Sequence, residues 1–196
     1  MNKHIGLFFG SFNPIHIGHL ILANHMVEHG TLDELWFVVS PQNPFKDKKS
    51  LLSDHHRLQM VVDAIINYPK FKASNIEFSL PRPSYTIDTL THLKEKYPGM
   101  EFTLIMGEDN LSGLSRWKNS QILLEENKIL VYPRLDENKQ KQLDTSFSHP
   151  NITLINAPII EISATAIRKM IKDGKNVRPL LPPEVFSYLD GSSFYK

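Results

Sequence analysis

Residues 10–19 read Gly10-Ser11-Phe12-Asn13-Pro14-Ile15-His16-Ile17-Gly18-His19, and they join two segments of different character. A short apolar run, Ile5 to Phe9, precedes them. In the segment that follows, Ile17 to His29, apolar residues recur near helical spacing. The pattern predicts a strand, a tight polar loop and the start of a helix.

This predicted loop has the chemistry of a phosphate site. The start of a helix carries free backbone N–H groups and the positive end of the helix dipole, so it attracts anions before any side chain is counted. We expect Gly10 and Gly18 to let a phosphate approach the backbone closely. His16 and His19 stand three apart, which puts both rings on one face if the helix has begun. Two ring donors beside phosphates favour stabilisation of a charged phosphoryl transition state.

A metal-binding interpretation of the two histidines is less favoured. No carboxylate lies between His16 and His19, and the His-Glu-x-x-His helix pattern is absent. Six other histidines are expected to be surface or structural residues: His25, His29, His55, His56, His92 and His149. We therefore predict no metal site built from protein side chains.

Composition limits the class of protein. A chain of 196 residues predicts a single domain, 1–196. The net charge is +1, so no overall field favours nucleic acid or an anionic membrane. Cysteine is absent, which excludes disulfides and thiolate chemistry. With no signal-peptide pattern and no membrane-spanning run, we expect a cytoplasmic protein.

Strand and helix patterns alternate along the chain. Further strands are predicted at 34–39, 73–80, 102–106, 128–132 and 151–156, and further helices near 54–66, 84–97, 163–171 and 182–189. The polar segment 135–150 is expected to be a loop or a short surface helix. Alternation of this kind predicts an α/β fold, a doubly wound and mostly parallel sheet with its ligand at the carboxyl edge.

Several later stretches could contribute to the same site. Lys46 lies in the loop after the second strand, and Gly107 with Asp109 follows the fourth. Trp117 fits either a partly buried anchor or a stacking platform for a planar substrate. Arg168, in the second turn of a helix capped by Ser163, suits bidentate contact with a phosphate.

Taken in order, these motifs resemble a known family. The stretches 10–19 and 162–168, Ile-Ser-Ala-Thr-Ala-Ile-Arg, resemble the two signatures of the nucleotidyltransferase superfamily. Within it, residues 83–90, 107–111 and 117–118 look like the bacterial nicotinate-nucleotide adenylyltransferases. The resemblance covers nearly the whole chain. It implies a Rossmann-like fold and a reaction in which ATP and nicotinate mononucleotide give nicotinic acid adenine dinucleotide and pyrophosphate, with Mg²⁺ arriving on ATP.

The resemblance also implies a role for each matching residue. Catalysis would fall to His16, His19, Lys46 and Arg168. The remaining contacts to ATP would come from Gly10, Ser11, Phe12, Gly18, Gly107, Asp109, Ser163 and Thr165. The acceptor would be bound by Thr86, Trp117, Lys118 and Arg134, with Trp117 stacking on the pyridine ring.

Two residues depart from the pattern of the family, and three alternatives stay open. Asn13 stands where many relatives have Asp, which removes a charge near the phosphates, and Ala164 replaces a serine. The acceptor could instead be phosphopantetheine or nicotinamide mononucleotide, or the chain could be a non-catalytic nucleotide sensor. A class I aminoacyl-tRNA synthetase is disfavoured, because no Lys-Met-Ser-Lys-Ser counterpart is present. The oligomeric state stays undetermined.

Overall fold

The computed structural model describes residues 2–41, 51–111, 113–134 and 149–196. Its strands form one six-stranded sheet, in which every neighbouring pair is parallel. They are β1 (Lys3–Gly10), β2 (Glu34–Val39), β3 (Phe71–Ser74), β4 (Met100–Gly107), β5 (Lys128–Tyr132) and β6 (Ile152–Leu154). The spatial order is β3-β2-β1-β4-β5-β6. The predicted doubly wound sheet is confirmed.

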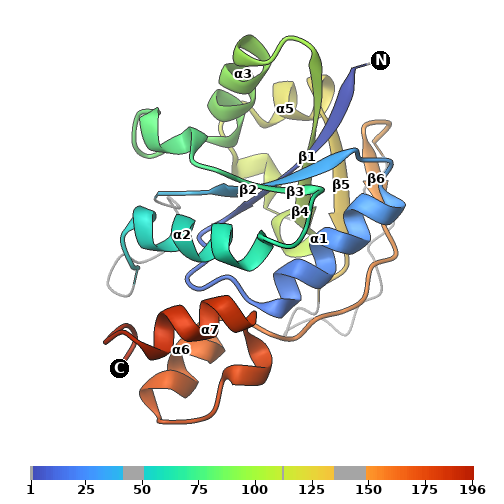
Figure 1. The fold of residues 1–196 in the computed structure, drawn as a ribbon. Helices are drawn as coiled ribbons and strands as arrows, with labels where there is room; N and C mark the ends of the chain where they lie inside the picture. Colours follow the sequence, from blue (N-terminus) through green and yellow to red (C-terminus); the bar gives the residue numbers. More distant parts are fainter. Residues whose placement is uncertain (1, 42–50, 112, 135–148) are drawn as a thin grey trace.

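Helices cover both faces of this sheet (Figure 1). The α-helices are α1 (Ile17–His29), α2 (Asp54–Ile65), α3 (Thr86–Lys96), α4 (Glu108–Leu111), α5 (Ser120–Glu126), α6 (Ala164–Lys172) and α7 (Pro183–Asp190). Short 3-10 helices are η1 (Ile76–Ser79), η2 (Leu114–Arg116) and η3 (Arg178–Leu180). Because α1 and α2 lie on the opposite face from α3 and α5, the central strands β1, β2 and β4 bury side chains on both of their faces.

The two faces of the sheet carry two separate hydrophobic cores. One joins α1 and α2 to the sheet and extends to α6 and α7, with Met26, Met60 and Val185 fully buried. The other joins α3 and α5 to the sheet around Leu90 and Leu104. Since β1, β2 and β4 are buried on both faces, they read as near-continuous apolar runs in the sequence.

The third predicted strand is wrong in its second half. Residues 71–74 form β3, but residues 76–79 turn into η1. The prediction relied on apolar positions 76, 78 and 80 alternating with polar ones. Glu77, which alternation would expose, is buried instead, because its carboxylate accepts hydrogen bonds inside the protein.

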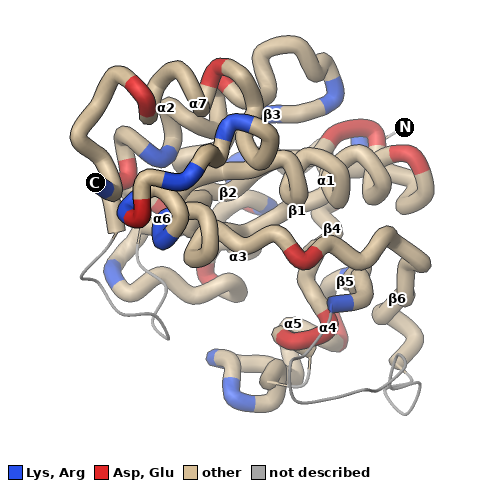
Figure 2. The backbone as a smooth tube through the Cα atoms, turned by 90° about the horizontal axis from the view of Figure 1, so that it is seen from below, with Lys and Arg blue, Asp and Glu red and all other residues tan. Residues whose placement is uncertain are grey.

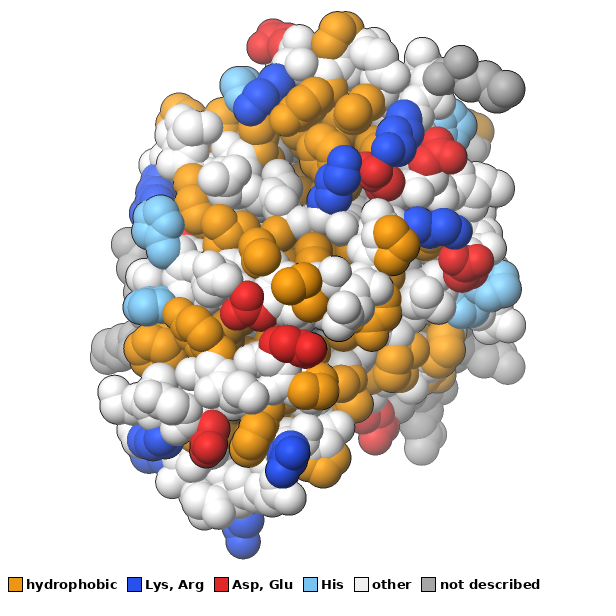
Figure 3. Space-filling view, in the orientation of Figure 1, with side chains coloured by type: hydrophobic (Ala, Val, Ile, Leu, Met, Phe, Trp, Pro, Cys, Tyr) orange, Lys and Arg blue, Asp and Glu red, His pale blue; other side chains and the backbone are white. Residues whose placement is uncertain are grey.

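The surface carries no large patch of one charge on the face seen in Figure 3, where acidic and basic side chains alternate with hydrophobic ones. In the view from below, several Lys and Arg residues lie on and around α6 (Figure 2). Among residues 2–41, 51–111, 113–134 and 149–196, none of the helices has both the length and the apolar character needed to span a bilayer.

Candidate active site

A cavity of about 670 Å³ lies at the carboxyl edge of the sheet, lined by the ends of β1 and β4. These two strands are neighbours, and the chain order of the strands reverses between them. A crevice at such a reversal is the usual ligand site of open α/β sheets. This cavity therefore lies at the carboxyl edge of the sheet, where the sequence predicted the ligand site.

The cavity brings together every predicted site residue that the structure describes. They are Gly10, Ser11, Phe12, His16, Gly18, His19, Thr86, Gly107, Asp109, Trp117, Lys118, Arg134, Ser163, Thr165 and Arg168. Lys46 lies outside the described residues. Shared lining of one cavity is what the site prediction required of these positions, while their individual roles stay predictions.

His16 and His19 form a stacked pair at the start of α1. His16 is the N-cap residue, and its backbone N–H donates to His19 Nδ1 at 3.2 Å. The two ring centroids are 3.7 Å apart. Burial of the ring, with a smaller contribution from Arg134, lowers the pKa of His16 to about 4. His16 is therefore a neutral imidazole at physiological pH in the unliganded protein.

The glycines of the loop have a packing reason of their own. A Cβ at Gly10 would lie 2.6 Å from the ring of Phe12, and a Cβ at Gly18 would lie 2.8 Å from Ile160 Cγ2. Phe12 itself adopts a left-handed backbone, with φ 45°, and is buried. Close packing of protein side chains thus explains both glycines without the phosphate that the sequence interpretation invoked.

The start of α6 lies against the loop after β1. Ser163 Oγ accepts a hydrogen bond from the Ala166 N–H at 3.2 Å, which caps the helix as predicted. Arg168 Nη1 donates to the Asn13 carbonyl at 2.8 Å, and Nη2 donates to Thr165 Oγ1 at 3.3 Å. The two stretches that carry the nucleotidyltransferase signatures are therefore in direct contact, although 155 positions separate Asn13 from Arg168.

The wall after β4 and β5 carries an ion pair. Arg134 Nη1 lies 3.1 Å from Asp109 Oδ2, and both side chains are partly exposed. A Cβ at Gly107 would lie 2.4 Å from Asp109 Oδ1, so glycine is required for this carboxylate to fold back over the end of β4. The positive charge of Arg134 is thus paired with the carboxylate of Asp109 at the cavity wall.

The α3 side of the cavity combines aromatic rings with a second ion pair. Trp117 is half-buried and packs against the second core, while it also lines the cavity. The anchor interpretation agrees with this packing, whereas a role as a stacking platform stays a prediction. Lys118 Nζ contacts the two carboxylate oxygens of Asp88 at 3.0 and 2.8 Å and lies 4.9 Å from the centre of the Tyr85 ring.

The sequence interpretation missed two buried charged residues beside the cavity. Glu77 lines it and accepts hydrogen bonds from Ser84 Oγ at 3.1 Å and Thr89 Oγ1 at 2.8 Å. Burial raises the pKa of Glu77. Arg57 is completely buried and donates to backbone carbonyls of the segments after β1 and β2.

A signal for Arg57 was present in the sequence. Its position falls in the same helical stripe as the buried residues of α2, which are Met60, Val61, Ala64 and Ile65. A charged residue in an apolar stripe predicts a buried, hydrogen-bonded side chain. Glu77 had no comparable signal, because the local pattern indicated a strand.

Within the described residues, no three His, Cys, Asp or Glu side chains are grouped so as to hold a metal ion. On the side of α1 and α6 the cavity instead presents the imidazoles of His16 and His19 and the guanidinium of Arg168. Such a set suits phosphates, and a divalent cation would there be held by phosphate oxygens and water.

Comparison with known proteins gives matches along the whole chain. The family model described as Cytidylyltransferase-like matches residues 7–170. A protein of Flavobacterium johnsoniae named "Probable nicotinate-nucleotide adenylyltransferase" is 58% identical over 193 residues, 98% of either chain. One of Christiangramia forsetii with the same name is 55% identical over the full length of both.

A solved structure has the same fold. It is the nicotinic acid mononucleotide adenylyltransferase of Plasmodium falciparum complexed with NaAD, with a TM-score of 0.82. The alignment covers 98% of this chain and 97% of that one, at 23% identity. A likeness at this identity supports the fold.

Proposed function

The chain belongs to the cytidylyltransferase-like family, and we infer that it transfers the AMP moiety of ATP to nicotinate mononucleotide. The products are nicotinic acid adenine dinucleotide and pyrophosphate. The observation that carries this proposal is that one cavity gathers the histidine pair, Arg168 and Trp117 at the carboxyl edge of the sheet.

The reaction needs positioning and charge stabilisation more than covalent chemistry. An oxygen of the acceptor phosphate attacks the α-phosphorus of ATP, and the bond from that phosphorus to the oxygen bridging it to the β-phosphorus breaks. Pyrophosphate leaves with the electrons of that bond. Negative charge therefore grows on the β-phosphate and on the oxygens around the α-phosphorus, and donors aimed at those oxygens lower the barrier.

The histidine pair supplies two such donors. His19 Nδ1 accepts from the His16 N–H, so Nε2 is the ring nitrogen of His19 that can donate to a ligand. His16 is neutral in the unliganded protein, and an anionic phosphate beside it would favour its protonated form. We propose that both rings bind ATP phosphates and stabilise the negative charge that develops on the phosphate oxygens during the transfer.

Arg168 acts at the leaving group in this proposal. Its guanidinium is held by the Asn13 carbonyl and by Thr165 Oγ1, which leaves its plane fixed between the loop and α6. A fixed planar fork suits bidentate contact with pyrophosphate oxygens. Ser163 and Thr165 lie on the same wall and would supply hydroxyl donors.

The acceptor would occupy the α3 side of the cavity. Trp117 would offer a ring face to the pyridine. Thr86, the first residue of α3, lines the same cavity. Lys118 also lines it and is paired with Asp88. Arg134 would reach the acceptor phosphate from its pair with Asp109. Lys46 would neutralise charge on the phosphates.

Mg²⁺ belongs to this proposal as a companion of ATP. It would be bound by phosphate oxygens and water, and when bound it would neutralise phosphate charge. The protein's own part is to orient the phosphates through the loop after β1 and the start of α6. A cytoplasmic location likewise stays a prediction.

The test is pyrophosphate release from MgATP with three acceptors in parallel. Strong preference for nicotinate mononucleotide supports the proposal. Preference for nicotinamide mononucleotide would keep the chemistry and change the substrate, and activity with phosphopantetheine would overturn the Trp117 role. Binding of ATP without turnover on any acceptor would favour a sensor.

A further inference from the structure

Asn13 connects three segments that are distant in sequence. It is buried in the loop after β1, and its Oδ1 accepts hydrogen bonds from the Leu52 N–H at 3.2 Å and the Tyr195 hydroxyl at 2.5 Å. Its carbonyl accepts from Arg168 Nη1 at 2.8 Å. Leu52, two residues before α2, Tyr195 in the segment after α7 and Arg168 in the middle of α6 therefore all bind one residue of the cavity wall.

Tyr195 is built into this position. It follows α7, packs against the first hydrophobic core and is half-buried. Its φ of 64° lies in the left-handed region of the backbone. Residues other than glycine adopt this region rarely, where the surrounding structure holds them in it. Burial raises the pKa of Tyr195, so its hydroxyl is protonated and can donate to Asn13.

We propose that Tyr195 is a positioning residue for the adenylyl transfer, because its hydroxyl fixes Asn13 and thereby the site of Arg168. Tyr195 does not line the cavity, so it acts through the loop rather than on substrate. The inference rests on the proposed function, since it assigns the loop and Arg168 to the phosphates of ATP. It predicts that removing the Tyr195 hydroxyl lowers kcat/KM for ATP and leaves the KM for nicotinate mononucleotide nearly unchanged.

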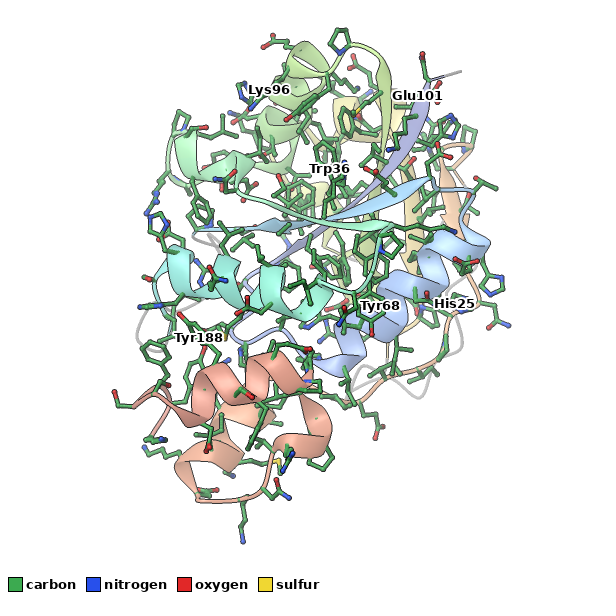
Figure 4. The ribbon with its side chains drawn as sticks, in the orientation of Figure 1. His25, Trp36, Tyr68, Lys96, Glu101 and Tyr188 are labelled. Carbon is green, nitrogen blue, oxygen red and sulfur yellow. The ribbon has the colours of Figure 1, made fainter. Side chains whose placement is uncertain are left out.

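Tyr188 provides a matched control on the neighbouring helix. Its hydroxyl lies 2.7 Å from His56 Nδ1, so it joins α7 to α2 (Figure 4). Neither Tyr188 nor His56 lines the cavity. A Tyr→Phe change there removes a hydrogen bond of the same kind from the same end of the chain without touching the loop.

The experiment compares Tyr195→Phe with Tyr188→Phe in steady-state kinetics. For Tyr195→Phe we expect kcat/KM for ATP to fall roughly tenfold, with the KM for nicotinate mononucleotide within about twofold of wild type. Tyr188→Phe should keep both parameters within about twofold, and both variants should melt within a few degrees of each other. The opposite result, similar kinetic losses in both variants or equal changes for both substrates, would show a merely structural role.

Asn13→Ala tests the same contact from its other partner. If Tyr195 acts through Asn13, adding Tyr195→Phe to Asn13→Ala lowers kcat/KM for ATP no further, whereas multiplying losses would overturn the proposal. Titration calorimetry with ATP alone separates this inference from the proposed function. An inactive wild-type protein would refute the function, and ATP affinity would still report whether the Tyr195 hydroxyl matters.

Discussion

The rings of His16 and His19 lie stacked, with an interplanar angle of 29°. The backbone N–H of His16 also donates to His19 Nδ1, which orients the His19 ring against the His16 ring. The pair therefore acts as one unit, and a change in either residue alters both. Effects of single substitutions here should not add.

Replacing His19 by alanine should remove most of the turnover. We expect kcat to fall by about 10² or more, because one donor to a developing oxyanion typically contributes that much. Pyrophosphate release at saturating ATP and nicotinate mononucleotide measures it. Turnover within a few-fold of wild type, in a variant with a wild-type melting curve, would refute the catalytic role.

The buried ring of His16 should make the free energy of unfolding depend on pH. Its pKa of about 4 in the folded protein lies below the ordinary value of 6.5, so the unfolded chain binds the proton first as pH falls. Stability present above pH 6.5 is then lost progressively down to pH 4, by about 2 kcal/mol at pH 5.

Urea unfolding at pH 7.5 and pH 5 measures this loss in wild type and in His16→Gln. Glutamine keeps polar atoms but does not titrate, so subtraction removes the contribution of the other histidines. The variant should lose about 2 kcal/mol less between the two pH values. Equal losses in the two proteins would show that His16 titrates normally.

Removing the Trp117 ring should affect the acceptor selectively. We expect Trp117→Ala to raise the KM for nicotinate mononucleotide about tenfold or more, as loss of a stacking partner does, with the KM for ATP within about threefold. Trp117→Phe, which keeps a ring face, should recover part of the difference. Equal increases in both KM values would mean that Trp117 is only an anchor.

Arg57 should be indispensable to the fold beneath the cavity. Its guanidinium donates to the carbonyls of Ser11 at 2.6 Å, Ser40 at 2.8 Å and Pro41 at 3.2 Å, and Nε donates to Leu52 at 3.0 Å. Arg57→Met leaves these buried carbonyls without their donors, so we expect a loss of about 3 kcal/mol or more in urea unfolding.

A lysine should not replace Arg57, because an ammonium cannot present the planar fork. The control is Arg82→Met, which removes a more exposed arginine paired with Asp54 and should cost less than about 1 kcal/mol. Similar losses for Arg57→Met and Arg82→Met would contradict the importance of the buried hydrogen bonds.

Local sequence patterns predicted the sheet, its parallel strands and the position of the cavity. They succeeded because buried parallel strands are apolar and because the loops between strand and helix carry polar residues at one edge. They failed at Glu77, where hydrogen bonds from Ser84 and Thr89 allow a carboxylate to be buried in η1. The two donors lie 7 and 12 positions further along the chain, outside the few residues over which strand alternation is read.

The same limit applies to the support of the site. Nothing near Asn13 in the sequence indicates that Tyr195, 182 positions later, donates to it. The stacked geometry of His16 and His19 also depends on the exact start of α1, which spacing alone leaves undecided. Positions of candidate residues are thus readable from the sequence, whereas their mutual orientation is a property of the folded chain.

The contact between Asn13 and Arg168 bears on when activity can arise during synthesis. The loop after β1 emerges early from the ribosome, but the wall formed by α6 follows about 150 residues later. At ordinary rates of about 5–20 residues per second, the nascent chain spends roughly 8 to 30 seconds without that wall. Under the proposed function, transfer of AMP therefore requires that α6 has docked against the loop after β1.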